Sequence, residues 1–319
     1  MALLLLALFL IARDLFRKSP SALPASCCND EYAELKQIDT ALLAYTKIKV
    51  IETGLINLSG ITVSETNEIF VCGNGIVAAF DTDGIGTGRF EIDSAAGTIT
   101  VDNSNIYLGI GPRIFSYTVD GAKVSEWKAF NPDGYITSLA VNENYVYAAD
   151  AISKTILKYN SAGDLLQEIG IKDSLSGARG FIIPSMYFDI SFGSFNDLWV
   201  VNPGRLSIEN FTVTGLMQSE WGIPSFENEG FGGCCNPAHF DILPDGDFVT
   251  YEKGVDKIKI FDPTGSFVGY VAAAGSFKGN TDLQLGNLDL VKDIAAGPDG
   301  NIYVLDAYNQ ISIFSKTDL

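Results

Sequence analysis

The rarest reactive side chains of this 319-residue chain gather in one segment, residues 229–241. Cys234 and Cys235 stand next to each other there, and His239 is the only histidine of the chain. Thiolate and imidazole ligands suit copper and zinc, so Cys234, Cys235 and His239 form a candidate metal site. A single histidine nevertheless falls short of the two or three that a zinc lyase or hydrolase normally uses.

The same segment also fits two interpretations without a metal. A disulfide could stiffen the loop, joining the adjacent cysteines to each other or to Cys27 or Cys28, with His239 as a satisfied residue at a strand start. The glycine-rich approach could instead bring the backbone of the loop close to a ligand. The residues alone leave these alternatives open. Cys72 lies apart in an apolar stretch, and we expect it to be an unpaired, buried thiol.

A second group of polar side chains recurs about every fifty residues, each directly after a short apolar stretch. The group consists of Asp150, Asn202, Glu252 and Asp306. Such oxygen ligands are those that Ca²⁺ and Mg²⁺ prefer, so the group is a candidate site for a hard cation. Arg205 and Lys253 follow the same stretches and are candidate ligand-binding residues. The alternative is a local role, in which each side chain accepts hydrogen bonds from the tight turn that it begins.

These side chains belong to a sequence repeat. Its clearest copy is AGPDGNIYVLD at residues 296–306, followed by ISIF at 311–314, and five earlier copies precede it. Each copy predicts two strands and a tight turn, with one strand before them and an outer strand after them. A single sheet of this kind has two apolar faces and cannot bury both, so the sheets must stack around an axis. We therefore predict an all-β, six-bladed β-propeller.

The two ends of the repeat region are expected to meet. The last copy leaves no room for its outer strand, whereas residues 44–53 form a predicted strand without a blade. Pairing these two segments would close the ring and remove both exposed sheet edges. The phrase GPDGNIYVLDAYNQISIF, from Gly297 onward, resembles the NHL repeat, and the resemblance covers roughly residues 55–319. It implies the six-bladed fold but no particular activity, because NHL propellers include scaffolds, ligand binders, lyases and lactonase-like hydrolases.

The first twelve residues, MALLLLALFLIA, are an unbroken apolar run with arginine and lysine close behind it. The run is short for a membrane-spanning helix, which needs about 17 to 25 residues, but it is typical of an export or anchoring segment. The sequence therefore predicts a signal or membrane anchor at 1–18, a linker with a short helix at 19–43, and the propeller at 44–319. The expected location is the membrane, with the propeller on the periplasmic or extracellular side.

The composition excludes some classes of function. A formal net charge of -18 repels phosphate backbones, so nucleic acid is not an expected partner, and it favours a soluble, monomeric propeller. Sequence motifs of serine hydrolases, HExxH metalloproteases and P-loop proteins are absent.

The favoured function is a membrane-tethered, non-catalytic module that binds a protein, peptide or glycan at the mouth of the propeller, and an assembly scaffold is a weaker variant of it. Loops at 171–185, 222–238 and 272–290 would form this mouth. The alternative is a metal-dependent enzyme or redox protein with its site at the same mouth.

Overall fold

A computed structural model describes residues 34–102, 104–173, 178–277 and 289–317. The chain divides into two units, Met1–Gln37 and Ile38–Leu319, of which the first has only its last four residues described. The predicted anchor at 1–18 and most of the linker at 19–43 thus lie outside the described residues. Among the helices that the structure describes, none is long and apolar enough to cross a membrane.

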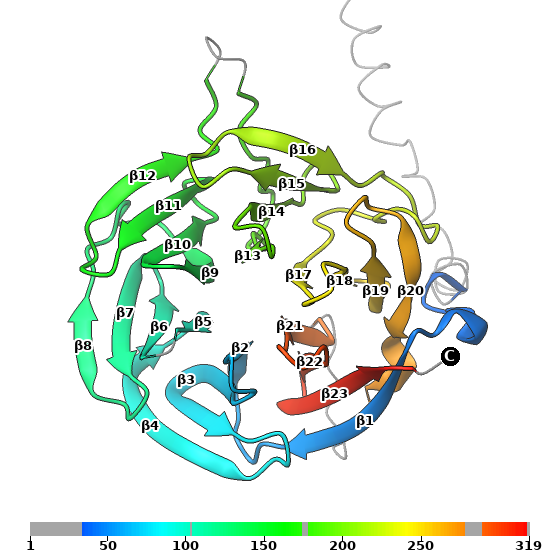
Figure 1. Ribbon diagram of the computed structural model, residues 1–319, viewed down its shortest axis with the longest axis horizontal. Coiled ribbons are helices and arrows are strands. Elements are labelled where there is room, and N and C mark those ends of the chain that lie inside the picture. Colours follow the sequence, from blue (N-terminus) through cyan, green and yellow to red (C-terminus); the bar gives the residue numbers. More distant parts are fainter. Residues whose placement is uncertain (1–33, 103, 174–177, 278–288, 318–319) are drawn as a thin grey trace, which may run out of the picture. The chain divides into compact units, whose positions relative to one another are not determined.

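The second unit is a ring of six antiparallel sheets, which confirms the predicted six-bladed β-propeller (Figure 1). Blade 1 contains β2 (Leu58–Val63), β3 (Ile69–Phe80) and β4 (Gly86–Ala95). Blade 2 contains β5 (Thr98–Val101), β6 (Asn105–Ile110), β7 (Arg113–Thr118) and β8 (Lys123–Glu126). Blade 3 contains β9 (Ile136–Asn142), β10 (Tyr145–Asp150), β11 (Thr155–Asn160) and β12 (Leu165–Ile169).

The remaining blades follow in chain order around the ring. Blade 4 contains β13 (Ile190–Phe192), β14 (Leu198–Asn202), β15 (Ser207–Phe211) and β16 (Met217–Trp221). Blade 5 contains β17 (His239–Ile242), β18 (Phe248–Glu252), β19 (Lys257–Phe261) and β20 (Phe267–Ala272). Blade 6 contains β21 (Val291–Ala296), β22 (Ile302–Asp306), β23 (Gln310–Lys316) and, as its outer strand, β1 (Tyr45–Glu52). The described residues also form two 3-10 helices, η1 (Thr40–Leu42) before β1 and η2 (Ala274–Ser276) after β20.

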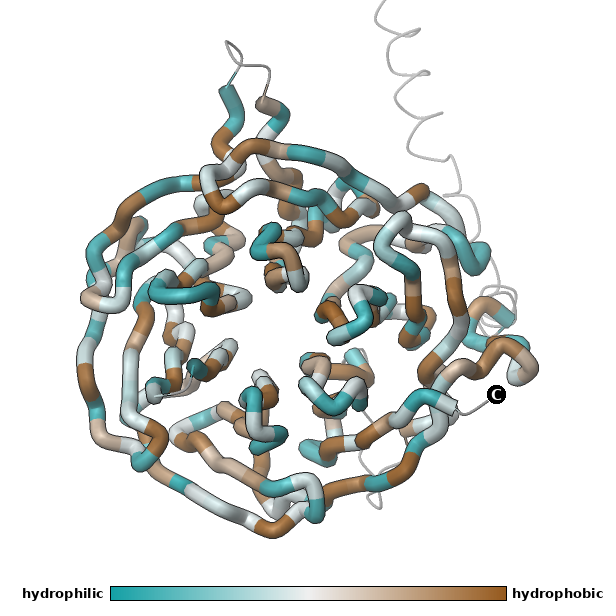
Figure 2. The backbone as a smooth tube through the Cα atoms, viewed as in Figure 1, coloured by the Kyte–Doolittle hydropathy of each residue, from teal (hydrophilic) through white to brown (hydrophobic). Residues whose placement is uncertain are grey.

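The ring closes as the sequence predicts. Strand β1 pairs antiparallel with β23, from Tyr45 opposite Lys316 to Glu52 opposite Gln310. The described core consists of six apolar clusters, each shared by two neighbouring blades. Figure 2 accordingly shows apolar residues in every blade rather than in one central block. Burial between blades therefore holds the ring together, because no blade can bury both faces alone.

Glycines in the turns between third and fourth strands allow close packing of neighbouring blades. Gly163 has a φ of +87°, and a Cβ there would lie 2.4 Å from the ring of Trp127 in blade 2. Gly265 has a φ of +83°, and a Cβ there would lie 2.7 Å from the ring of Trp221 in blade 4. Only glycine combines this left-handed conformation with so close an approach.

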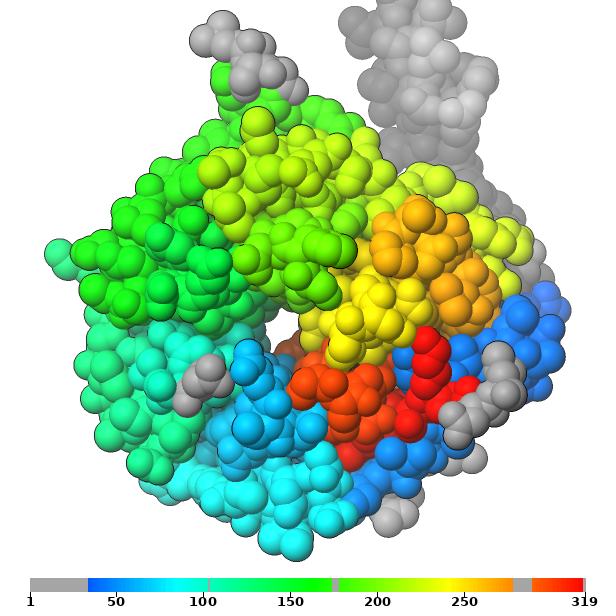
Figure 3. Space-filling model, in the orientation of Figure 1, coloured from blue at the N-terminus to red at the C-terminus, as the bar shows by residue number. Residues whose placement is uncertain are grey.

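The first strand of each blade lines a central channel, and Figure 3 shows an opening at the centre of the ring. The register fixes which residues share one end of this channel. Asp150, at the end of β10, pairs with Ile136, at the start of β9, so second strands end where first strands begin. The connections that enter β13, β17 and β21 lie at this same end, which we call the mouth.

Candidate functional site

Two layers of side chains line the channel, one from each of two positions on the first strands. We call the layer nearer the mouth the first ring. The strand register identifies its residues, because each lies opposite an equivalent residue of the second strand, as His239 lies opposite Tyr251. Its members are Gly60, Thr98, Ser138, Asp189, His239 and Asp293. The second ring lies two residues further along each strand, since alternate residues share a face. Its members are Thr62, Thr100, Ala140, Ser191, Asp241 and Ala295.

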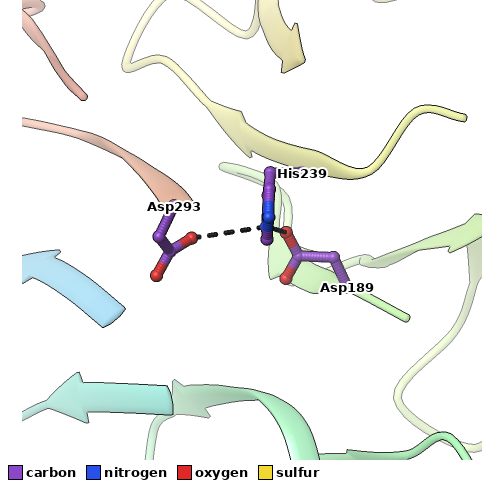
Figure 4. Close-up of side chains that lie close together, drawn as sticks. All are labelled: Asp189, His239 and Asp293. Atoms are coloured by element: carbon purple, nitrogen blue, oxygen red, sulfur yellow. Dashed lines mark ion pairs between the residues drawn. The ribbon is translucent and has the colours of Figure 1, made fainter. Parts of the chain in front are cut away.

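The first ring is strongly asymmetric. Blades 1 to 3 contribute only small residues, whereas blades 4, 5 and 6 contribute Asp189, His239 and Asp293. The nitrogen His239 Nδ1 lies 3.7 Å from Asp189 Oδ2 and 3.6 Å from Asp293 Oδ1. Figure 4 shows the three side chains close together, with His239 and Asp293 in β17 and β21 and Asp189 just before β13. One ligand atom from each lies within 4.8 Å of the others, which makes this group a candidate metal centre.

Backbone groups of neighbouring blades orient both aspartates. The carboxylate of Asp189 accepts hydrogen bonds from Ile190 N at 3.0 Å and from Phe240 N, in the next blade, at 3.1 Å. The carboxylate of Asp293 accepts hydrogen bonds from Ile294 N at 2.9 Å and, across the closure of the ring, from Ile61 N at 3.0 Å. Such outer contacts fix ligand orientation before any ion arrives.

Aromatic rings hold the imidazole from two sides. The ring of Tyr251, opposite His239 in the sheet, lies nearly parallel to the imidazole at 6.3 Å. The ring of Tyr187 meets the imidazole edge-on at 5.8 Å. The side chain of His239 is 19% exposed, so it remains open to the channel while its orientation is restricted.

The channel holds more carboxylate than its few neutralising groups can offset. Burial raises the pKa of Asp241, in the second ring, to about 6. Burial also raises the pKa of Asp293 well above its usual range, although the charge of His239 opposes this. Burial by itself would lower the pKa of His239, but Asp189 and Asp293 outweigh that effect and raise it. The ionised form of each carboxylate is therefore costly in the channel, and the two aspartates favour the charged form of the imidazole between them.

The recurring oxygen residues do not meet in a common site. Asp150 Oδ1 accepts hydrogen bonds from the backbone of Tyr135, Ile152 and Ser153, and Asp306 Oδ1 accepts them from Tyr308 and Gln310. The other two members behave similarly, since Asn202 accepts from Ile182 N and Glu252 from Gly232 N. Each side chain is buried within its own blade, which agrees with the local role.

The structure separates the histidine from the two cysteines of its segment. Cys235 is buried, Cys234 is exposed, and both are free thiols. Among the described residues, the metal-ligand group contains His239 with Asp189 and Asp293 and contains no cysteine. Cys72 is a buried free thiol, as expected. Cys27 and Cys28 lie outside the described residues, and the structure shows neither Cys234 nor Cys235 in a disulfide.

A buried ion pair, not a disulfide, anchors the loop before β17. The ammonium of Lys259 lies 2.5 Å from Glu252 Oε1 and donates a hydrogen bond to Gly230 O at 2.8 Å. The other oxygen of Glu252 accepts a hydrogen bond from Gly232 N at 2.7 Å. The loop is thereby fixed to the second and third strands of blade 5.

The two predicted basic residues occupy different surroundings. Arg205 pairs with the buried carboxylate of Glu209 at 3.0 Å, in blade 4 and away from the ring residues. The ammonium of Lys253 lies 4.8 Å from the ring centre of Tyr187, which itself contacts His239. Only Lys253 is therefore linked to the candidate metal centre by described contacts.

Sequence reasoning missed Asp189 and Asp293. The segments YFDISF and HFDIL have similar sequences, and aligning them makes Asp241 the equivalent of Asp189. The sheet register instead makes His239 the counterpart of Asp189, because Asp189 lies two residues further from its following hairpin turn than Asp241 does. Aligning the repeats by the positions of their hairpin turns, instead of by residue identity, would have identified the three residues as equivalent.

Comparison with known proteins supports the fold alone. No family model and no curated protein matches the chain, so the NHL resemblance stays a prediction. A streptogramin B lyase structure superposes with a TM-score of 0.61 at 16% identity, covering 88% of this chain and 100% of that one.

Two further solved structures extend this likeness. A catalytically inactive histidine-to-alanine variant of virginiamycin B lyase from Staphylococcus aureus, solved with quinupristin, gives a TM-score of 0.58 at 15% identity, covering 86% of this chain and 99% of that one. The WD40 β-propeller domain of Doa1 gives 0.53 at 13% identity, covering 82% of this chain and 79% of that one. The chain therefore shares its β-propeller architecture with these lyases and with a WD40 domain.

Proposed function

We propose that this propeller binds a divalent cation at Asp189, His239 and Asp293, and that the cation holds a small ligand at the mouth of the channel. The observation that carries the proposal is the convergence of one imidazole and two carboxylates from three successive blades within 4.8 Å. This replaces the cysteine-containing set with ligands that the fold brings together.

Two of the three ligand separations suit a tetrahedral first-row transition ion. Such an ion bound at about 2.1 Å leaves about 3.4 Å between neighbouring ligand atoms. The separations from His239 Nδ1 are 3.6 and 3.7 Å, so each needs to shorten by only a few tenths of an ångström. Imidazole suits Zn²⁺ and carboxylate suits Mn²⁺, whereas the thiolates that select copper(I) are absent from this group.

The electrostatics of the channel also support a cation. Burial raises the pKa values of Asp241 and Asp293, and a bound cation would offset the cost of their ionised forms. Metal binding should therefore release protons and strengthen as the pH rises through neutrality.

The test is a Mn²⁺ titration of the full-length, metal-depleted chain in detergent, followed by electron paramagnetic resonance. We expect one tight equivalent in the original chain and at least tenfold weaker binding in Asp293→Asn. The matched control is Asp299→Asn, which removes the same charge from the turn after β21 at the other end of blade 6. Equal binding in all three proteins, or no stoichiometric binding, would refute the cation site.

Acid–base catalysis is a second candidate function, because burial raises the pKa of Asp241, which lines the channel, to about 6. In the lyase structure described above, replacing one histidine abolishes catalysis, and His239 would be the corresponding type of group here. Screening the metal-loaded protein for lyase and hydrolase turnover tests this. Turnover that persists in His239→Gln would exclude a catalytic role for the imidazole.

We further propose that the propeller acts as a monomer, tethered by residues 1–18 on the periplasmic or extracellular side of a membrane. The apolar run of the N-terminal segment supports the tether. On the same basis the mouth would face a protein, peptide or glycan that carries the bound group. Membrane fractionation with added protease is the test, and recovery of the chain in the soluble fraction would contradict the tether.

A further inference from the structure

Two lysines stand at the mouth beside the candidate metal centre. Lys292 precedes Asp293 in β21 and is the unpaired residue of a bulge, because Val291 pairs with Asp306 while Asp293 pairs with Leu305. Bulges commonly re-aim a side chain next to a functional site. Lys253 follows β18, and its backbone is fixed by a 3.0 Å hydrogen bond from its N–H to Asn236 Oδ1.

The place of each lysine in the fold puts it beside the centre. Lys253 Nζ and the His239 imidazole lie 4.8 and 5.8 Å from the same ring centre, that of Tyr187, so they are within about 11 Å of each other. Lys292 is the chain neighbour of Asp293, so the Cα atoms of these two residues lie about 3.8 Å apart.

Neither lysine is neutralised by an ion pair within the described part of the chain, although the protein is strongly acidic. Other lysines do pair with carboxylates, such as Lys49 with Asp83 at 2.7 Å and Lys316 with Asp245 at 2.9 Å. Asp289, which lies three residues before Lys292, accepts a hydrogen bond from the hydroxyl of Tyr187. Two ammonium groups are therefore available at the mouth.

We propose that the group recognised at this mouth is an oxyanion, a carboxylate or a phosphate, held between the bound cation and the ammonium groups of Lys253 and Lys292. The proposal rests on the cation site proposed above. Three protein ligands leave a further coordination position open. A divalent ion would offset the charges of Asp189 and Asp293, and the two lysines would add positive charge where the oxyanion binds. An oxygen of the oxyanion could then enter the open position.

The experiment uses the full-length chain loaded with one equivalent of Mn²⁺ and two probes, inorganic phosphate and ¹³C-labelled malonate. Paramagnetic broadening of the ³¹P or ¹³C signal reports an anion close to the protein-bound ion. We expect saturable broadening by at least one probe, and the probe that binds more tightly identifies phosphate or carboxylate as the preferred group. The double variant Lys253→Met, Lys292→Met should bind that probe at least tenfold more weakly.

The controls separate this inference from the cation site itself. Lys128→Met, which removes an exposed lysine after β8, should keep the affinity of the original chain for the anion. Circular dichroism melting verifies that each variant is folded. Mn²⁺ binding with no anion broadening, or with broadening unaffected by the lysine substitutions, would overturn the oxyanion proposal alone. Failure to bind Mn²⁺ would overturn the cation site and this inference together.

Discussion

Replacing one partner of the buried pair Glu252 and Lys259 should destabilise the propeller severely. Lys259 has no exposed surface, Glu252 is 1% exposed, and their charged atoms lie 2.5 Å apart. Removing one charge leaves the other buried and unpaired, which typically costs about 3 to 5 kcal/mol. We therefore expect Lys259→Met to lower the free energy of unfolding by about that amount.

Removing both charges should cost less than removing either one, because no unpaired charge remains. Urea unfolding of the original chain, Lys259→Met, Glu252→Gln and the double variant completes the cycle, and we expect a coupling energy above about 1 kcal/mol. The same single variants should weaken Mn²⁺ binding, because the pair fixes the loop that leads into His239. Additive effects, or a cost below about 1 kcal/mol for Lys259→Met, would refute the assigned role of this pair.

Three further predictions follow from burial and backbone conformation. Burial raises the pKa of Asp241 in the folded protein to about 6, so this group stabilises the fold most below its unfolded pKa near 4 and loses that contribution as the pH rises through 6. In urea titrations of the metal-free proteins, Asp241→Asn should therefore lose less stability than the original chain between pH 5 and pH 7. Equal losses would contradict this. Gly163→Ala should lower the melting temperature by several degrees, because it combines a φ of +87° with a clash against Trp127, and an unchanged melting curve would show that the turn can relax. Maleimide should label exposed Cys234 in the native protein but label buried Cys72 only after unfolding, as peptide mass spectrometry would show; equal native labelling would contradict the burial of Cys72.

The sequence was sufficient to predict the blades and their closure. Turn signals such as Pro-Asp-Gly and the spacing of the repeats predict four strands in every blade, and the leftover segments at the two ends predict how the ring closes. Five blades have four strands, but blade 1 has three, because β3 pairs with β2 through its first half and with β4 through its second half. The orphan strand predicted at 44–53 is β1, Tyr45–Glu52. These features depend on local chemistry and on the need to bury both faces of every sheet, so they can be recognised without three-dimensional information.

The site could not be predicted in the same way, because it depends on register. Asp189, His239 and Asp293 meet only because the hairpins of blades 4, 5 and 6 place three different residues at one level of the channel. The carboxylates that the repeat made conspicuous, such as Asp150 and Asp306, are buried beside turn N–H groups that take up their hydrogen bonds. A buried carboxylate needs hydrogen-bond donors close to it, and here the turn N–H groups provide them within each blade, away from the channel.

The cation site is tested most directly by a crystal structure of the protein grown with Mn²⁺, with anomalous diffraction used to locate the ion. We predict one strong anomalous peak in the channel, about 2.0 to 2.3 Å from His239 Nδ1 and from one oxygen each of Asp189 and Asp293. A channel without a peak, or a single peak beside Cys234 and Cys235, would contradict the proposed centre.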